Sequence, residues 1–266
     1  MIARYFISSL LKDKTLWGWG VGFMFMWLYL GAFVFGSNAT SQQGWLIDAS
    51  SWFSIIGLIS GSLVATTISY SIYYSTSSLA YGFRYTKLKP GSYVFNLTAG
   101  ASLVSAIIGC FIILFTIVLF SESSGYSIIP AMPVQALLLF FLTGIFMFLF
   151  SLITVILVNN YLGMRSSSFA NFLPQLLSYI FGFSEFGSPL PPDVVYASPF
   201  SDIPRLMYMT FSGKESYLNM SDLSGPVINS YILFASLLIW ISVMFVMAMA
   251  LIRRIKAKSI EEGRHV

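Results

Sequence analysis

The run YVFNLTAGASLVSAIIGCFIILFTIVLF, residues 93–120, contains no Asp, Glu, Lys or Arg. About 20 predominantly apolar residues are enough for a helix to cross the hydrocarbon core of a bilayer, and a longer helix can tilt. This run is therefore predicted to form a transmembrane helix. Five further apolar runs occur along the chain, at residues 16–36, 51–75, 133–158, 169–186 and 227–252.

The run at 169–186 is the weakest of the six. It is the shortest, and Pro174 interrupts it. A proline inside a helix removes a backbone hydrogen bond and crowds the preceding turn. We therefore expect this helix to be kinked or partly re-entrant.

The overall composition agrees with this pattern. The chain is 57% hydrophobic and only 9% charged, with a mean hydropathy of +0.80, whereas soluble domains carry roughly 25% charged residues. Strands of a transmembrane barrel alternate in polarity, but these runs are unbroken. The sequence predicts an all-α integral membrane protein with six transmembrane helices in a single domain, residues 1–266.

The positive charges predict the orientation. A cytoplasmic N-terminus leaves only Arg205 and Lys214, of 14 Lys and Arg, on the outside. Cytoplasmic loops carry the excess of positive charge. We therefore expect a multi-pass protein of the cell membrane with both termini, including the tail 253–266, in the cytoplasm. The net charge of +4 bears on this orientation, and no nucleic-acid partner is expected.

The N-terminal residues 1–15, MIARYFISSLLKDKT, are amphipathic. Apolar residues recur every four positions from Ile2, and polar residues recur every four positions from Arg4. This spacing predicts a helix that lies in the inner membrane interface. The alternative is a disordered basic terminus.

The longest segment between runs, 185–226, is rich in proline and is predicted to lie outside. Within it, SDIPRLMYMTFSG, residues 201–213, is predicted to form a short helix capped by Ser201 or Asp202 and ended by Gly213. This helix is too short to span a membrane. Its apolar residues suit the outer interface or a shallow, re-entrant dip into the membrane.

The motifs of several enzyme classes are absent from the sequence. There is no GxxxxGK[ST] loop for ATP, and the single histidine, His265, lies in the tail. No Asp, Glu, Lys or Arg falls in the middle of a run, so a proton relay within the membrane is not expected, and a path without charge suits an apolar or amphipathic cargo. We predict no catalytic residue, no metal and no cofactor on this chain.

Polar side chains inside the runs are candidates for a substrate path or a dimer interface. Asn171 and Gln175 are four residues apart, on one helical face, and polar amides at depth face protein or a cavity. Trp27, Thr66 and Thr67 complete this set. For the hydroxyls of the run 51–75, bonding back to their own helix remains an alternative.

Three rows of small residues recur every fourth position and allow close approach of helices. Either packing within the chain or a dimer seam is consistent with them. The rows are Gly18 and Gly22, Gly57 and Gly61, and Ala101, Ser105 and Gly109.

Two stretches, FRYTKLKPGSYVF (83–95) and YASPFSDIPRLMYMTFSG (196–213), together with the order of the runs, resemble the transmembrane subunits of type-2 ABC exporters, the ABC-2 permease family. The resemblance covers essentially the whole chain. The Gly-Thr-Leu-Glu core of the family's inner helix is missing, and Ser198-Pro199-Phe200 stands where the family has Asn-Pro-Leu.

The resemblance implies that residues 76–92 form a cytoplasmic coupling segment that docks on a separate ATP-binding-cassette ATPase. It also implies a homodimer, or a heterodimer with a similar permease, and ATP and Mg on the partner ATPase. The cargo would be a lipid, glycolipid, hydrophobic peptide or drug-like molecule. The implied coupling residues are Leu79, Phe83, Arg84, Lys87, Leu88 and Lys89.

Two alternatives remain open. The cations of the coupling segment can act as topology signals alone. The whole chain can also be a non-transporting membrane scaffold or assembly subunit, which needs no path and no ATPase.

Overall fold

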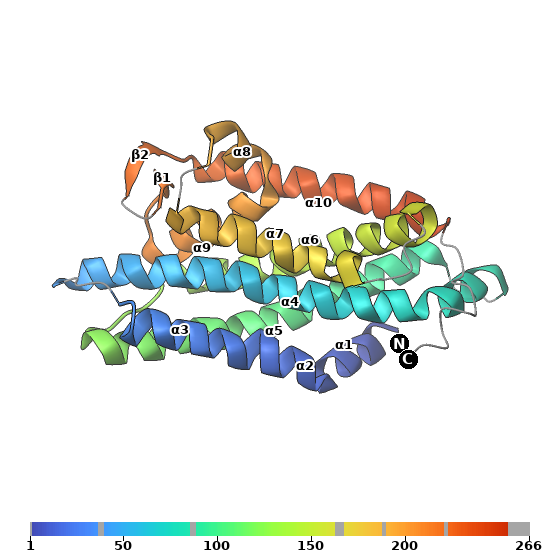
Figure 1. The fold of residues 1–266 in the computed structure, drawn as a ribbon, viewed down its shortest axis with the longest axis horizontal. Coiled ribbons are helices and arrows are strands. Elements are labelled where there is room, and N and C mark those ends of the chain that lie inside the picture. Colours follow the sequence, from blue (N-terminus) through green and yellow to red (C-terminus); the bar gives the residue numbers. More distant parts are fainter. Residues whose placement is uncertain are drawn as a thin grey trace.

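The computed structural model describes residues 2–36, 40–85, 89–162, 168–187, 190–220 and 223–254, and it shows long helices lying side by side in one bundle (Figure 1). Lys87, Leu88 and Arg165 lie outside the described residues, as do 255–266. In the described part, five helical segments are long and apolar enough to cross a membrane: Lys14–Phe33, Gln42–Ser75, Pro90–Ser124, Pro133–Tyr161 and Ser230–Ile252. The chain is therefore an all-α protein of the multi-pass membrane type.

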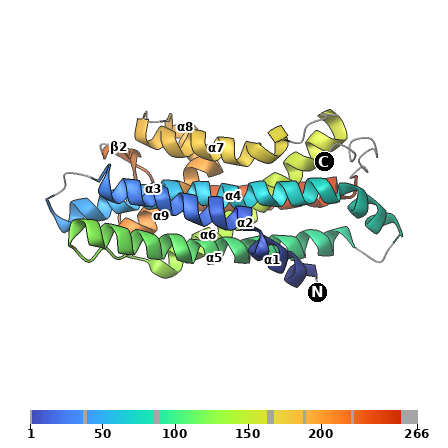
Figure 2. The same ribbon diagram turned by 60° about the horizontal axis from the view of Figure 1, so that its bottom comes forward.

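The fifth predicted run, 169–186, forms α7 (Ser168–Gly187), with Pro174 inside the helix, and this helix is not among the five that are long and apolar enough to cross a membrane. Figure 2 shows α7 and α8 (Pro192–Ala197) on one side of the bundle and α5 (Pro90–Ser124) on the other, with α4 (Gln42–Tyr85) between them. We call the end that holds α1 (Ile2–Lys12) and Tyr85 the α1 end. The opposite end, with strands β1 (Tyr217–Asn219) and β2 (Ser224–Val227), is the hairpin end.

The first span is not a regular α-helix. It consists of α2 (Lys14–Trp17), the π-helical turn η1 (Gly18–Phe23) and α3 (Met24–Phe33). The Asp13 side chain accepts a hydrogen bond from the backbone N–H of Thr15 at 2.8 Å and so caps α2. The indole N–H of Trp17 donates to the Leu11 carbonyl at 2.7 Å and ties α1 to this span.

The helix α4 is much longer than the predicted run 51–75. It has 44 residues, which corresponds to about 66 Å at 1.5 Å per residue, whereas a bilayer with its headgroups is about 40–45 Å thick. The predicted link 76–92 is therefore mostly a continuation of α4. The next helix, α5, begins at Pro90, where the missing N–H costs no helical hydrogen bond.

Two of the three rows of small residues hold helices of this chain together. A Cβ at Gly57 would overlap the sulfur of Met207, and one at Gly61 would lie 2.7 Å from Cγ2 of Thr143 on α6 (Pro133–Leu157). On α5, the Ser105 hydroxyl donates to the Phe140 carbonyl of α6 at 2.8 Å. At Gly18, by contrast, a Cβ would meet no atom within 4 Å.

After α6, the π-helical turn η2 (Val158–Leu162) extends the fourth span. The last long helix is α10 (Ser230–Ile252), which follows the small antiparallel hairpin. Between α8 and the hairpin lies α9 (Pro199–Ser212), which starts two residues before the predicted cap Ser201 and ends, as predicted, at Gly213 with φ 73°.

Candidate functional site

The helix α9 lies inside the bundle. It packs against α4, α6, α7 and α10, and Ile203, Met207 and Phe211 are fully buried. Its first turn is deep, because the ring of Phe200 packs against Phe150, in the second half of α6, with ring centroids 5.4 Å apart. Its apolar side chains thus face neighbouring helices of the same chain.

The other end of α9 reaches the hairpin end. The backbone N–H groups of Ala131 and Met132, just before α6, donate to the carbonyls of Phe211 and Thr210 at 2.9 Å. The helix therefore rises from the middle of the bundle to the end at which α6 begins.

Two charged residues are buried in α9. Asp202 and Arg205 are 0% and 1% exposed, although both lie outside the six apolar runs. The guanidinium of Arg205 donates through Nη1 to the carbonyl of Tyr217 and through Nη2 to that of Leu218, the latter at 2.9 Å. Arg205 therefore anchors the hairpin to α9.

Asp202 is in a different situation. Neither of its carboxylate oxygens accepts a hydrogen bond of normal geometry from any residue that the structure describes. Burial raises the pKa of Asp202 to about 8, and the nearby hydroxyl of Ser236 on α10 and the positive charge of Arg205 offset only part of this effect. In this packing the carboxyl group is therefore neutral at neutral pH.

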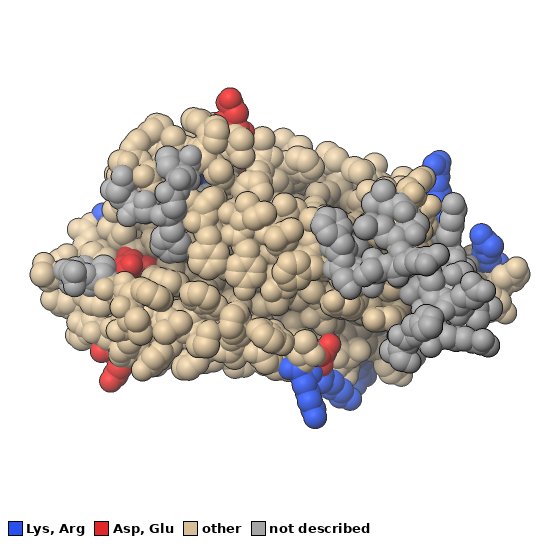
Figure 3. Space-filling model, viewed as in Figure 1, with Lys and Arg blue, Asp and Glu red and all other residues tan. Residues whose placement is uncertain are grey.

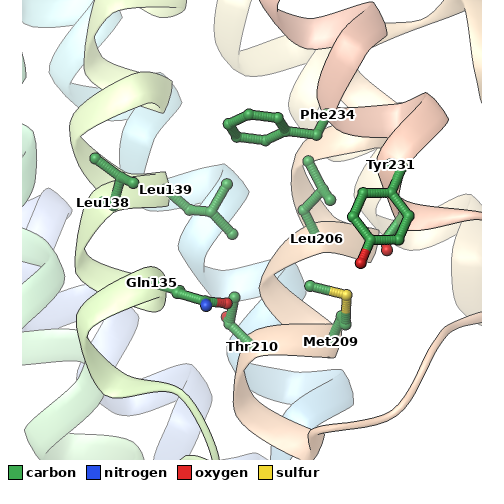
Figure 4. A pocket seen from close by; sticks show the side chains of 9 residues that line it. Gln135, Leu138, Leu139, Leu206, Met209, Thr210, Tyr231 and Phe234 are labelled. Carbon is green, nitrogen blue, oxygen red and sulfur yellow. The ribbon is translucent and has the colours of Figure 1, made fainter.

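A cavity lies between α6, α9 and α10 on the hairpin side of Asp202. Its volume is about 300 Å³, and Figure 4 shows the side chains of Leu139, Leu206 and Phe234 around it. Gln135, Thr210 and Tyr231 add the polar groups. We call it cavity 1.

A second cavity, cavity 2, lies between α6, α8, the start of α9 and α10. Its volume is about 430 Å³, and Phe146 and Phe150 of α6 and Trp240 of α10 line it. The indole N–H of Trp240 donates to the carbonyl of Ala197 at 2.8 Å, which joins α10 to the end of α8.

The predicted path residues line neither cavity. Trp27 packs edge to face on Phe183 of α7, with ring centroids 5.9 Å apart. Thr66 and Thr67 donate to the carbonyls of Ser62 and Leu63, both at 3.0 Å, so the hydroxyls of α4 bond back to their own helix. Thr67 also lines a cavity of about 470 Å³ between α1 and α4.

The two predicted amides lie on α7. Asn171 is fully buried, and its side-chain oxygen and nitrogen make no hydrogen bond to any described residue. Gln175 is half-buried and lies next to the Tyr179 hydroxyl. Asn171 is therefore a buried polar group within the bundle that lines neither cavity.

The predicted coupling residues divide into two groups. Leu79 is buried in the core of the bundle, and Phe83 packs edge to face on Tyr93 of α5 at 5.6 Å. Arg84 and Lys89 are exposed. Two aromatic side chains of this region, Tyr81 and Tyr85, are 64% and 71% exposed. No signal in the sequence singled them out. Their rings lie 4.7 Å apart on one face of α4.

Among the described residues, no group of three or more His, Cys, Asp or Glu side chains is placed to hold a metal ion. Neither the protein-family models nor the curated proteins with which the chain was compared match it. Function is therefore inferred from the residues and their geometry.

Proposed function

We propose that this chain is the transmembrane permease subunit of an ATP-binding-cassette exporter, driven by a separate ATPase subunit. It moves an apolar or amphipathic substrate out of the cytoplasm. The observation that carries this proposal is the buried helix α9, whose first turn separates two cavities lined mainly by apolar side chains. In this arrangement α7 is the fifth of six spans, and α8 and α9 form the re-entrant segment.

The distribution of charge supports the proposed orientation. Most Lys and Arg side chains visible in Figure 3 lie on the half of the molecule that holds α1 and the end of α4. This half faces the cytoplasm in the proposal, with both termini, because cytoplasmic segments are enriched in positive charge. The membrane is the cell membrane.

The ATPase binds the α1 end of α4 in this proposal. Tyr81, Arg84 and Tyr85 form an exposed surface there, and aromatic and arginine side chains are the commonest anchors of protein interfaces. We call these three residues the α4 tip. Arg84 and Lys89 would meet acidic groups of the ATPase or anionic lipid headgroups.

A continuous helix links the α4 tip to the cavities. The same α4 that ends at Tyr85 touches α9 through Gly57 and Met207. A displacement of the tip by the closing ATPase is therefore passed through this contact to α9, which borders both cavities. A second copy, or a similar permease, completes the transporter as a dimer.

Co-purification tests this function. The tagged chain is purified from its native membrane, and a co-purifying ATPase in a fixed ratio is expected. The Tyr81→Ala, Tyr85→Ala double variant should lose this partner about thirtyfold, because an interface anchor contributes about 2 kcal/mol. The matched control is Tyr5→Ala, since Tyr5 is also 71% exposed and lies at the same end.

Two results would count against the proposal. If no ATPase accompanies the wild-type chain, the alternative of a non-transporting scaffold subunit is favoured. If the ATPase binds the double variant and the control equally, the α4 tip is not the coupling surface.

A further inference from the structure

Cavities 1 and 2 lie along one seam between the same two helices. On α6, the lining passes from Leu139 at cavity 1 to Phe146 at cavity 2. On α10 it passes from Phe234 to Trp240, and Ser236, which faces Asp202, lies between these two residues in the helix. The two cavities therefore follow one another along the seam, with the first turn of α9 between them.

The chemistry of the lining selects the occupant. Aliphatic and aromatic side chains form most of the walls, so a ligand rich in hydroxyl or amide groups would leave most of those groups without partners. Polar side chains of cavity 1, Gln135 and Ser230, lie at the starts of α6 and α10, towards the hairpin end. An apolar chain with one polar end at the hairpin end fits this distribution.

The volumes are also suitable. Pockets for small molecules measure about 300–1,000 Å³, and the cavities measure about 300 and 430 Å³. Each cavity is large enough for part of a flexible chain, and together they extend from the middle of the bundle to the hairpin end.

The helix α10 is the loosest wall of the seam. Only 22% of the most apolar stretch of α10 is buried inside the bundle, against 67% of the corresponding stretch of the span that contains α6. Few contacts make a local separation inexpensive. Between the cavities, the seam is closed by Asp202 of α9 and Ser236 of α10, and a neutral carboxyl group lets an apolar chain pass more readily than a charged one.

The geometry points to a binding site for a fatty-acyl chain in the seam between α6 and α10, with Asp202 and Ser236 as the constriction between its two halves. This inference names the substrate class of the proposed function. Transport of the acyl chain rests on that function, but binding of the chain does not. The acyl chain belongs to the substrate, and its polar end lies at the hairpin end. Binding itself needs no ATPase.

Photolabelling of the purified chain in phosphatidylcholine nanodiscs tests the site. The probe is palmitic acid with a diazirine at the middle of its chain, at low mole fraction, and labelled residues are identified by mass spectrometry. Labelling of Phe234 and Trp240 should saturate and be competed by unlabelled palmitic acid. Labelling of Val246, which faces outward and is 68% exposed, should follow the bulk lipid without saturation.

Two variants fill cavity 1, Met209→Trp and Leu138→Trp. Leu138 is 51% exposed at the rim, so its replacement needs no rearrangement of the core. Both variants should lower the saturable labelling about tenfold, the effect of a contact change of about 1.4 kcal/mol. The control is Val243→Trp, an exposed position of α10 outside both cavities, which should label as the wild type does.

A second probe distinguishes the source of the chain. This probe is phosphatidylcholine that carries the same diazirine chain. If it labels the same residues, the site binds a membrane lipid. If only the palmitic acid probe labels them, the site binds a free fatty acid. Uniform labelling along α10 without saturation would overturn the site. Labelling of Leu138→Trp to the wild-type level, at an unchanged Tm, would also overturn it. Because the readout contains no ATPase, a failed co-purification leaves it unaffected.

Discussion

Replacement of Asp202 by Asn is the sharpest probe of the buried carboxyl group. The change keeps the shape of the side chain but removes its titration. In the native chain the pKa of Asp202 is about 8, raised from 3.8 by burial. Between these two pH values the unfolded chain has lost a proton that the folded chain keeps.

The sign and size of the effect follow from this difference. A folded state that binds the extra proton loses stability as the pH rises, by about 1.4 kcal/mol per pH unit while only the unfolded form is ionised. The loss begins near pH 4, is complete near pH 8, and is of the order of 5 kcal/mol in total. Asp202→Asn should lack this loss and should be the more stable form at pH 8.

Thermal unfolding followed by intrinsic tryptophan fluorescence in detergent at pH 5, 6.5 and 8 measures this effect. The wild type should melt progressively earlier as the pH rises, and Asp202→Asn should show a flatter dependence. Asp193→Asn serves as the control, because Asp193 is an exposed carboxylate on α8. Parallel pH profiles for the wild type and Asp202→Asn would refute the assignment of a neutral buried carboxyl group.

Three further predictions concern packing and orientation. Gly61→Ala should lower the stability by about 1–3 kcal/mol, because the added methyl group overpacks against α6. Gly18→Ala is the control, since its methyl group meets no neighbour. Equal melting temperatures of the two variants would contradict this prediction. Arg205→Lys should loosen the hairpin, since one ammonium group cannot hold both carbonyls in the same geometry. The expected result is faster proteolysis within 217–227. An unchanged cleavage rate would argue against Arg205 as the anchor of the hairpin. In a Cys110→Ser background, Tyr85→Cys should react only with a thiol reagent that reaches the cytoplasm; labelling from outside the cell would reverse the orientation.

The long helices could be predicted because a helix in a membrane is specified by its own residues. An unbroken apolar run such as 93–120 must satisfy its backbone hydrogen bonds internally, and a helix does this locally. The end of α9 at Gly213 could be predicted for the same reason, because a glycine cap acts on its own turn. The end of α4 was misplaced, since hydropathy marks where the apolar run ends but not where the helix ends, and α4 continues to Tyr85.

The surroundings of α9 could not be read from the sequence. A short helix with apolar and polar residues looks the same whether its apolar face meets lipid or other helices. Burial was decided by partners far away in the chain, among them Gly57 and Phe150, and by the absence of a side chain at Gly57 that makes room for Met207.

The same distinction separates the predicted path residues from those that line the cavities. Thr66 and Thr67 were chosen for their chemistry, yet their hydroxyls are satisfied by their own helix. Asp202 was set aside as a helix cap in an outer loop, and only the folding of α9 back into the bundle buries it against α10. Which segments form apolar helices follows from local hydrophobicity, so the amino-acid sequence is enough to predict it. Which charge is buried and where cavities remain depend on contacts between distant segments, so only the folded chain shows them.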